Sequence, residues 1–382
     1  MARLDVAGLT YVLPDGRTLL DSVSFQLGPG ITAGLVGPAG SGKSLLLRLI
    51  ARELRPAAGR ISTEGAIGYL PQERGATSGR RQAALETLLR GSHELLLLDE
   101  PDDHLDVSGK ERLEDQLRGS AKTVLLVSRD RQLLANAANR IIFLDQGRLG
   151  THGGGYATYS GSRCPRPAGA GAAELGGEHA FTCRRLRFAG LTAPFDLRVR
   201  FGERVALLGS DDAGRAVFLS LLADPPGPGQ AAAPYRGILD VHPRARAMRL
   251  DHRWPGPGLK GRSVAGIVMD QRRCGREEAM ALLTRYGISR EWMRPYETLR
   301  TAQRRALRIL LAEVEGVNLL LLSDPTGDLD VPGAETVQHA VRGFPGAVVA
   351  STCDRWLTAE FPRLLHFCAD GRVREPGAGA RC

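Results

Sequence analysis

The chain carries the same glycine-rich loop twice, and only the first copy is intact. Residues 37–44 read GPAGSGKS and fit the pattern G-x-x-x-x-G-K-[ST], in which backbone amides surround nucleotide phosphates. Residues 209–216 read GSDDAGRA, with Arg215 in place of the lysine and Ala216 in place of the hydroxyl residue. Because this loop joins a buried strand to a helix, the sequence predicts two strand–loop–helix units, one of them altered.

The segments around the two loops also repeat each other, and they set the fold class. Each copy has two strand-like segments before the loop, a helix after it and two apolar runs farther along. The expected strands are 19–27, 30–36, 95–101 and 123–128 in the first copy and 195–201, 204–208, 319–325 and 347–352 in the second, and the expected helices are 44–54 and 216–222. Strands that alternate with helices predict parallel α/β layers, so we expect two tandem α/β domains of the P-loop NTPase type.

A segment without periodicity separates the two copies. Residues 160–180 are rich in glycine, alanine and proline, a composition typical of a linker. The chain of 382 residues is long enough for two domains. We therefore expect a first domain at residues 1–159, a linker at 160–180 and a second domain at 181–382.

Bulk composition bounds the class of protein. No apolar run approaches the ~20 residues of a membrane helix, and the first residues contain no extended apolar stretch typical of a signal peptide. Six cysteines without CxxC spacing argue against a disulfide framework and predict a cytoplasmic location. The net charge is +9, and only four of the 51 basic residues are lysines. This arginine bias fits a GC-rich coding sequence, and the alternative is a surface that faces RNA or the ribosome.

The first copy carries a set of residues suited to phosphate chemistry. We expect Lys43 to reach the β- and γ-phosphates, and Ser44 and Asp99 to bind Mg²⁺. Glu100, at the end of the buried run LLLLDE, is placed to act on an attacking water. The expected phosphate-binding residues are Gly37, Pro38, Ala39, Gly40, Ser41, Gly42, Lys43 and Ser44.

As a set, these motifs resemble the ATP-binding cassette (ABC) family. The resemblance rests on GPAGSGKS, IGYLPQE, SGRRQAAL and LLLLDEPDDHLD, and the ending DQGRLGTHGGGYATYS is similar to the ABC-F subfamily, which has two cassettes in one soluble chain. It implies ATP and Mg²⁺ as ligands. It also implies that Gln72 senses the γ-phosphate and metal, and that Arg129 stands where the family has its switch histidine. The aromatic residue that stacks on adenine is displaced, and Tyr11 is the candidate substitute.

Spacing predicts that the first cassette has lost most of its helical subdomain. Gly37 precedes Asp99 by 62 positions, whereas Gly209 precedes Ser323 by 114. Most of the difference lies directly after Gln72. In the family this segment carries the signature peptide to the opposite cassette, so we expect residues 77–81 (TSGRR) not to reach it.

The second cassette is altered at nearly every motif position. Besides Arg215 and Ala216 these are His252 in the Gln loop, the signature LRTAQ at 299–303, Ser323 and Asp324 at the acidic strand end, and Cys353 at the switch. We expect it to be catalytically inactive, because it lacks the lysine and the metal ligands that stabilise phosphoryl transfer.

The leading hypothesis is therefore an ABC-F-like protein that binds Mg-ATP in the first cassette and hydrolyses it slowly, with its two cassettes paired within the chain. A ribosome-acting version is the usual ABC-F role, although the family's basic helical hairpin between cassettes is absent at 160–180. Two alternatives stay open. One is the ATP-binding subunit of a transporter with a separate membrane permease, and the other is a nucleotide-responsive scaffold that does not hydrolyse ATP.

Overall fold

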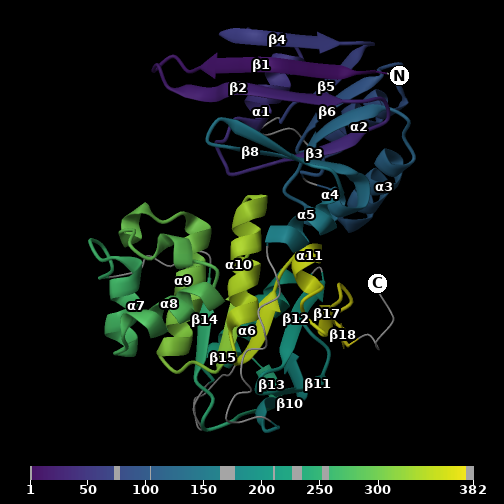
Figure 1. Ribbon diagram of the computed structural model, residues 1–382. Helices are drawn as coiled ribbons and strands as arrows, with labels where there is room; N and C mark the ends of the chain where they lie inside the picture. The colour runs from purple at the N-terminus through teal and green to yellow at the C-terminus, as the bar shows by residue number, and fades with distance from the viewer. Residues whose placement is uncertain are drawn as a thin grey trace. The chain divides into compact units, whose positions relative to one another are not determined.

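The computed structural model describes residues 2–72, 78–103, 105–163, 177–209, 211–225, 235–251 and 258–375. The chain forms two compact units, Met1–Pro165 with Asp330–Pro332, and Arg166–Leu329 with Gly333–Cys382 (Figure 1). Most of the expected linker, residues 164–176, lies outside the described ranges. No helix within the described residues is long and apolar enough to cross a membrane.

The first unit combines an antiparallel sheet with a mainly parallel one. The antiparallel sheet has the order β2-β1-β4, formed by Thr18–Leu27, Leu4–Val12 and Ala58–Thr63. The six-stranded sheet has the order β5-β6-β7-β3-β8-β9, formed by Ile67–Leu70, Leu95–Asp99, Thr123–Val127, Thr32–Val36, Arg140–Asp145 and Arg148–His152. Strands β3, β6 and β7 are buried along their whole length, as expected for a parallel sheet covered on both faces.

Five helices accompany these sheets within the described part of the first unit: α1 (Lys43–Ile50), α2 (Ser78–Arg90), α3 (Val107–Arg118), α4 (Arg131–Ala137) and α5 (Tyr156–Arg163). Helix α1 packs against β6 and β7, and α2 packs against β5. Asp106 and Asp130 begin α3 and α4, and each side chain accepts a hydrogen bond from a backbone amide of the first turn.

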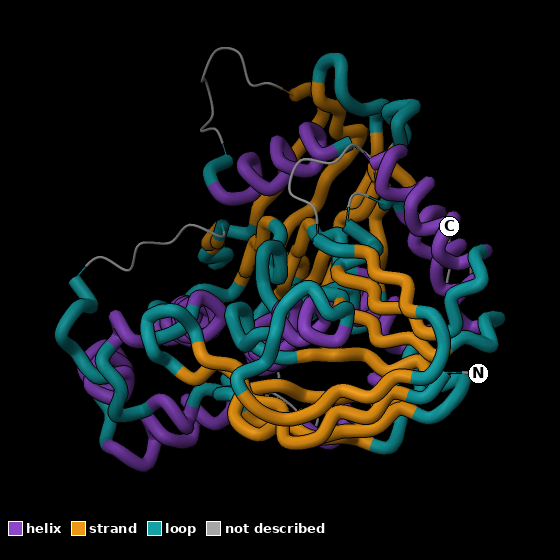
Figure 2. The backbone as a smooth tube through the Cα atoms, turned by 90° about the horizontal axis from the view of Figure 1, so that it is seen from above, coloured by secondary structure: helices purple, strands orange, loops and turns teal. Residues whose placement is uncertain are grey.

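The second unit repeats this plan strand for strand. Its antiparallel sheet has the order β11-β10-β13 (Phe195–Arg200, His179–Phe188, Tyr235–Val241). Its six-stranded sheet has the order β14-β15-β16-β12-β17-β18 (Ala247–Leu250, Leu319–Ser323, Ala347–Ser351, Arg204–Gly209, Arg363–Phe367, Val373–Arg374). The predicted duplication of an α/β domain is thereby confirmed. Figure 2 distinguishes the strands of the chain (orange) from its helices (purple).

The helices show where the two units differ. The second unit has α6 (Asp212–Ala223), α7 (Val264–Arg272), α8 (Arg276–Arg285), α9 (Thr301–Val314), α10 (Val331–Gly343) and α11 (Arg355–Thr358), with 3-10 turns at Ser289–Glu291 and Tyr296–Thr298. Helices α7, α8 and α9 pack together around one apolar core (Figure 1). Between the matching strands β5 and β6 the described residues of the first unit contain only α2, so the helical subdomain is largely missing there, as predicted.

Several local expectations need correction. The segments expected at 19–27 and 30–36 belong to different sheets, and the antiparallel sheet of each unit was not predicted. The helix expected at 44–54 ends at Ile50, because Arg52 adopts a left-handed backbone conformation with φ of 65°. The helix expected at 216–222 begins four residues earlier, at Asp212, because the Asp211 carboxylate caps its first turn.

Candidate nucleotide site

The first glycine loop connects β3 to α1 and leaves the start of α1 open. Gly37 has φ of 156°, and a Cβ atom there would lie 2.0 Å from the Leu144 carbonyl oxygen, so the close approach of these backbones requires glycine. The N-cap of α1 is Gly42, with φ of 99° and no side-chain cap. No side chain caps the first turn of α1, so these amides can be offered to an anion, while the Ala39 amide earlier in the loop donates to the Asp330 carboxylate at 2.6 Å.

The last two residues of the loop, Lys43 and Ser44, make different contacts. Lys43 Nζ donates to the carbonyl oxygens of Gly37 and Pro38, at 2.8 Å each, so the lysine folds over its own loop. Burial lowers the pKa of this ammonium. The Ser44 hydroxyl interacts with the Asp99 carboxylate at the end of β6 and acts to lower its pKa.

The pair of Ser44 and Asp99 fits the expected magnesium site. Asp99 is 1% exposed, and its Oδ1 is buried without a hydrogen-bond partner among the described residues. Burial raises the pKa of Asp99, while Ser44 and Arg81 act in the opposite direction. A buried carboxylate oxygen beside a hydroxyl is a donor set that Mg²⁺ prefers, and a divalent cation would offset the burial of this charge.

Glu100 lies one residue beyond β6 and is held by Arg129. Its backbone adopts a left-handed conformation with φ of 49°, and its amide donates to the Val127 carbonyl at 2.8 Å. The buried carboxylate accepts hydrogen bonds from the Arg129 backbone amide at 3.1 Å and from Arg129 Nε at 3.3 Å. Burial and the neighbouring Asp102 raise the pKa of Glu100 to about 7, although Arg129 opposes the shift.

A pocket brings most of the predicted residues together. Its lining includes Gly37, Ala39, Gly40, Gly42, Lys43, Ser44, Leu19, Gln72, Glu100, Val127, Ser128 and Arg129. Gln72 is exposed, and its side-chain amide lies 3.5 Å from an Asp103 carboxylate oxygen. Four predicted residues are not among the residues lining the pocket: Pro38, Ser41, Asp99 and Tyr11. Tyr11 packs against the hydrophobic core of the unit, and its role at the adenine stays a prediction.

Arg81 is a site residue that the sequence reasoning missed. This residue belongs to the expected signature remnant, but its side chain is 5% exposed inside its own unit. Its guanidinium donates to the carbonyl oxygens of Pro71, Asp99 and Glu100 at 3.0, 2.6 and 2.8 Å. Arg81 thus ties the segment before Gln72 to the end of β6, and it positions both carboxylate-bearing residues.

The matching loop of the second unit is filled by its own side chains. The Asp211 carboxylate accepts a hydrogen bond from the Gly214 amide at 2.9 Å, so a side-chain carboxylate already uses a donor that phosphate would need. Arg215 is 3% exposed and pairs with Asp212. Ser323, at the end of β15, offers a hydroxyl where the first unit has the carboxylate of Asp99. His252 lies outside the described residues.

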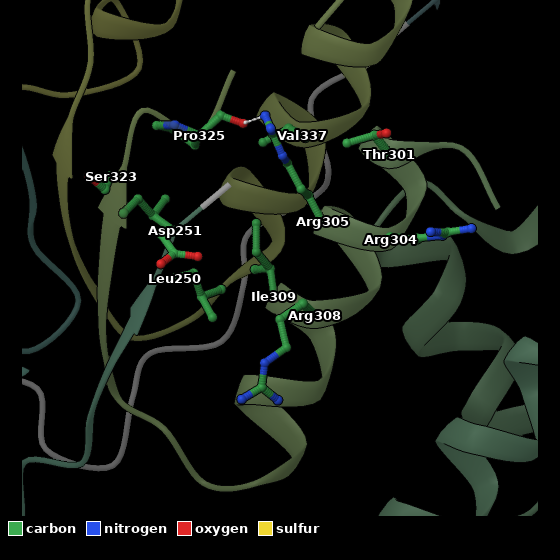
Figure 3. Close-up of a pocket in the computed structure, with 11 residues that line it drawn as sticks. Leu250, Asp251, Thr301, Arg304, Arg305, Arg308, Ile309, Ser323, Pro325 and Val337 are labelled. Carbon is green, nitrogen blue, oxygen red and sulfur yellow. Dashed lines mark hydrogen bonds between the residues drawn. The ribbon is translucent and has the colours of Figure 1, made fainter. Parts of the chain in front are cut away.

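The second unit has a cavity in a different place. It has a volume of about 200 Å³ and lies between α9 and the ends of β14 and β15, and no residue of 209–216 lines it (Figure 3). Arg305 on α9 donates to the carbonyl oxygen of Pro325 at 3.0 Å (Figure 3). It also donates to the carbonyl oxygen of Gly327 at 2.9 Å. Arg305 precedes Ser323 by 18 positions, as Arg81 precedes Asp99, which identifies α2 as the counterpart of α9.

Comparison with known proteins agrees with this geometry. The ABC transporter family matches residues 20–83, which span the phosphate loop and the start of α2. An antibiotic resistance protein of Mycobacteroides abscessus is 29% identical over 98% of this chain and 99% of that protein. Their alignment has 545 positions against 382 residues here, so at least 163 positions of the relative have no counterpart in this chain.

Two further matches bear on the fold and the subfamily. The ribosome protection protein VmlR of Bacillus subtilis is 32% identical over 40% of this chain and 33% of that protein. An archaeal ribosome recycling factor, solved with a ribosomal stalk protein, has a TM-score of 0.65 over 96% of this chain and 89% of that chain, at 15% identity, which shows the fold alone. The chain is an ATP-binding cassette protein with two tandem cassettes, and it is similar to the ABC-F subfamily.

Proposed function

We propose that the first unit binds one Mg-ATP and hydrolyses it slowly, and that the second unit binds none. The observation that carries the proposal is the convergence of Lys43, Ser44 and Glu100 on one pocket, with the unpartnered Asp99 oxygen next to Ser44. The filled loop at Asp211 and Arg215 supports a stoichiometry of one nucleotide for each chain.

Each residue has a distinct task in this proposal. The loop amides and Lys43 bind and orient the phosphates of ATP, and Ser44 and Asp99 hold the metal, which when bound neutralises phosphate charge. Gln72 lines the same pocket and would contact the γ-phosphate end of bound ATP. Glu100 orients a water molecule and accepts its proton, which its pKa of about 7 allows near neutral pH. Arg129 contacts Glu100 and restrains it.

Calorimetric titration with Mg-ATP tests the binding step. We expect one nucleotide for each chain, and we expect Lys43→Ala to abolish binding because it removes the cation that faces the phosphates. Arg215→Ala is the matched control in the second unit and should leave the stoichiometry and affinity unchanged. Absence of binding, or binding that Lys43→Ala does not affect, would contradict the proposal.

Single-turnover phosphate release tests hydrolysis. We expect Glu100→Gln to retain ATP binding and to release phosphate at least about 10-fold more slowly than the wild type, because the amide cannot accept the proton. Equal release from both proteins would show that the unit binds nucleotide without enzymatic turnover.

A partner is proposed from the names of the relatives. The Bacillus subtilis relative is a ribosome protection protein and the Mycobacteroides abscessus relative an antibiotic resistance protein, so we propose that this chain acts on the ribosome in the cytoplasm. Cosedimentation with ribosomes in the presence of ATP is the test. Failure of the Glu100→Gln variant to cosediment under any nucleotide condition would remove the ribosome from the proposal.

A further inference from the structure

The outer face of the antiparallel sheet in the second unit is dominated by arginine. The inward residues of β10 and β11 are buried in the core of the unit, among them Phe181, Leu186, Phe188, Phe195, Leu197 and Val199. Because side chains alternate along a strand, their neighbours point to solvent. The exposed set, here called the arginine face, consists of Arg184, Arg187, Arg198, Arg200 and Arg236.

Among the described residues none of these five arginines forms an ion pair with a carboxylate, whereas other arginines of this unit do so, for example Arg342 with Glu360. The acidic residues of the same face are Asp196 and Asp240. The Asp196 carboxylate accepts a hydrogen bond from the Arg185 backbone amide, so one of its oxygens is already engaged by the backbone.

Strand register places one pair of arginines of this face directly opposite each other. Arg187 on β10 pairs directly with Arg236 on β13, and Arg198 on β11 lies opposite Thr182. Like charges in directly opposed positions destabilise a sheet unless an anion lies between them. Neighbouring strands are about 4.8 Å apart and alternate residues about 7 Å, so the face presents a closely spaced array of guanidinium groups.

The first unit provides an internal control for the arginine bias of the chain. Its sheet has the same register: Asp5 pairs with Gln26 and Ser62, as Thr182 pairs with Arg198 and Asp240. At the positions that match Arg184, Arg187, Arg198, Arg200 and Arg236, the first unit has Ala7, Thr10, Gln26, Gly28 and Ala58. Two sheets of one chain share the same overall composition bias, yet the matching face of the first sheet carries one exposed arginine, Arg60 opposite Ala7, against five in the second, so that bias alone does not account for the arginine face.

We propose that the arginine face binds the phosphodiester backbone of RNA. Guanidinium groups suit phosphate oxygens because they donate two parallel hydrogen bonds and keep their charge, and contacts to phosphates alone predict binding that does not depend on sequence. The choice of RNA over an anionic membrane rests on the proposed action at the ribosome. The affinity comes from the release of counterions and falls with added salt.

The test exchanges residues between the two sheets. Arg184→Ala, Arg187→Thr and Arg198→Gln together install the residues that the first unit carries at the same register positions, so the fold has a precedent within the chain. The control is Arg60→Gln, Arg90→Gln and Arg118→Gln, three exposed arginines of the first unit whose removal changes the net charge equally. Anisotropy of a short labelled RNA duplex reports binding by each full-length protein.

We expect the exchange to weaken RNA binding at least about 10-fold at low salt and to reduce the slope of log K against log salt by about 2–3, while the control changes affinity less than about 3-fold. Equal weakening by both variants would overturn the proposal in favour of net charge. The proposal would be overturned in favour of a membrane if the wild type bound no RNA but bound phosphatidylserine vesicles, and if the exchange variant lost that vesicle binding.

Titration of Mg-ATP into the same proteins separates the two proposals. If the wild type binds ATP and the exchange leaves RNA binding intact, only the arginine face is refuted. If RNA binding depends on the face but Lys43→Ala leaves ATP binding unchanged, only the proposed nucleotide site is refuted.

Discussion

The contact between Arg129 and Glu100 predicts that Arg129→His speeds hydrolysis. In the present geometry one carboxylate oxygen of Glu100 is 3.3 Å from Arg129 Nε and the other is 3.1 Å from the Arg129 amide, so both oxygens are engaged. A carboxylate that must accept a proton from water has to give up one of these bonds. Histidine at this position keeps the backbone contact and removes the guanidinium. The Glu100 carboxylate can then accept a proton from water at a lower free-energy cost.

The magnitude follows from the burial of the two partners. The Glu100 side chain is 7% exposed and that of Arg129 is 52% exposed. The interaction free energy of this pair therefore lies between that of an exposed ion pair, up to about 1 kcal/mol, and that of a hydrogen bond to a buried charge, about 1.5–3 kcal/mol. A cost of about 1–1.5 kcal/mol corresponds to a factor of about 5–13 in rate. We expect kcat to rise by that factor while KM for ATP stays within about twofold.

Three variants give this measurement its controls, with steady-state phosphate release as the assay. Arg129→Lys keeps the cation and should remain close to the wild type. Arg118→His removes an arginine of similar exposure, 56%, that pairs with Asp115, and should have no effect. Arg129→His combined with Glu100→Gln should return to background, since the gain acts through Glu100. A lower kcat in Arg129→His with an unchanged Arg129→Lys would refute the reasoning, because it would assign Arg129 to stabilising the reacting phosphate.

Three other outcomes are expected from the structure. Arg81→Ala should lower the free energy of unfolding by about 2–4 kcal/mol in urea titration, because it leaves carbonyls at Pro71, Asp99 and Glu100 without their donor, whereas a similar loss in the exposed Arg90→Ala would contradict this. Arg215→Lys with Ala216→Ser should leave calorimetric stoichiometry at one, since the Asp211 carboxylate still occupies the Gly214 amide, and a second bound nucleotide would refute that reading. Gly37→Ala should lower the melting temperature, since its Cβ would lie 2.0 Å from the Leu144 carbonyl oxygen, and an unchanged melting temperature would contradict it.

The sequence predicted the repeated architecture, and it also predicted several residues that the structure brings to one pocket, because both depend on local pattern. The loop 37–44 and the run 95–98 each determine a strand, a turn and a donor set without information from distant residues. The antiparallel sheets were missed because the outward-facing residues of their central strands, β1 and β10, are of mixed polarity and give no clear alternating pattern. These strands become recognisable only through their pairing with neighbouring strands. Tyr11 was placed by strand parity, but the register shifts on both sides of it break that parity.

Arg81 explains how the first cassette tolerates the loss of its helical subdomain. In the second unit, Arg305 on α9 binds carbonyls beyond the end of β15, and α9 is held in turn by α7 and α8. The described part of the first unit has no counterpart of α7 and α8, yet α2 still presents an arginine 18 positions before the acidic strand end. This arginine reaches Pro71 as well as Asp99 and Glu100, so the segment before Gln72 is fastened directly to β6. The first cassette therefore lacks counterparts of α7 and α8 among its described residues and keeps the arginine contact that orders the end of β6 at Asp99 and Glu100.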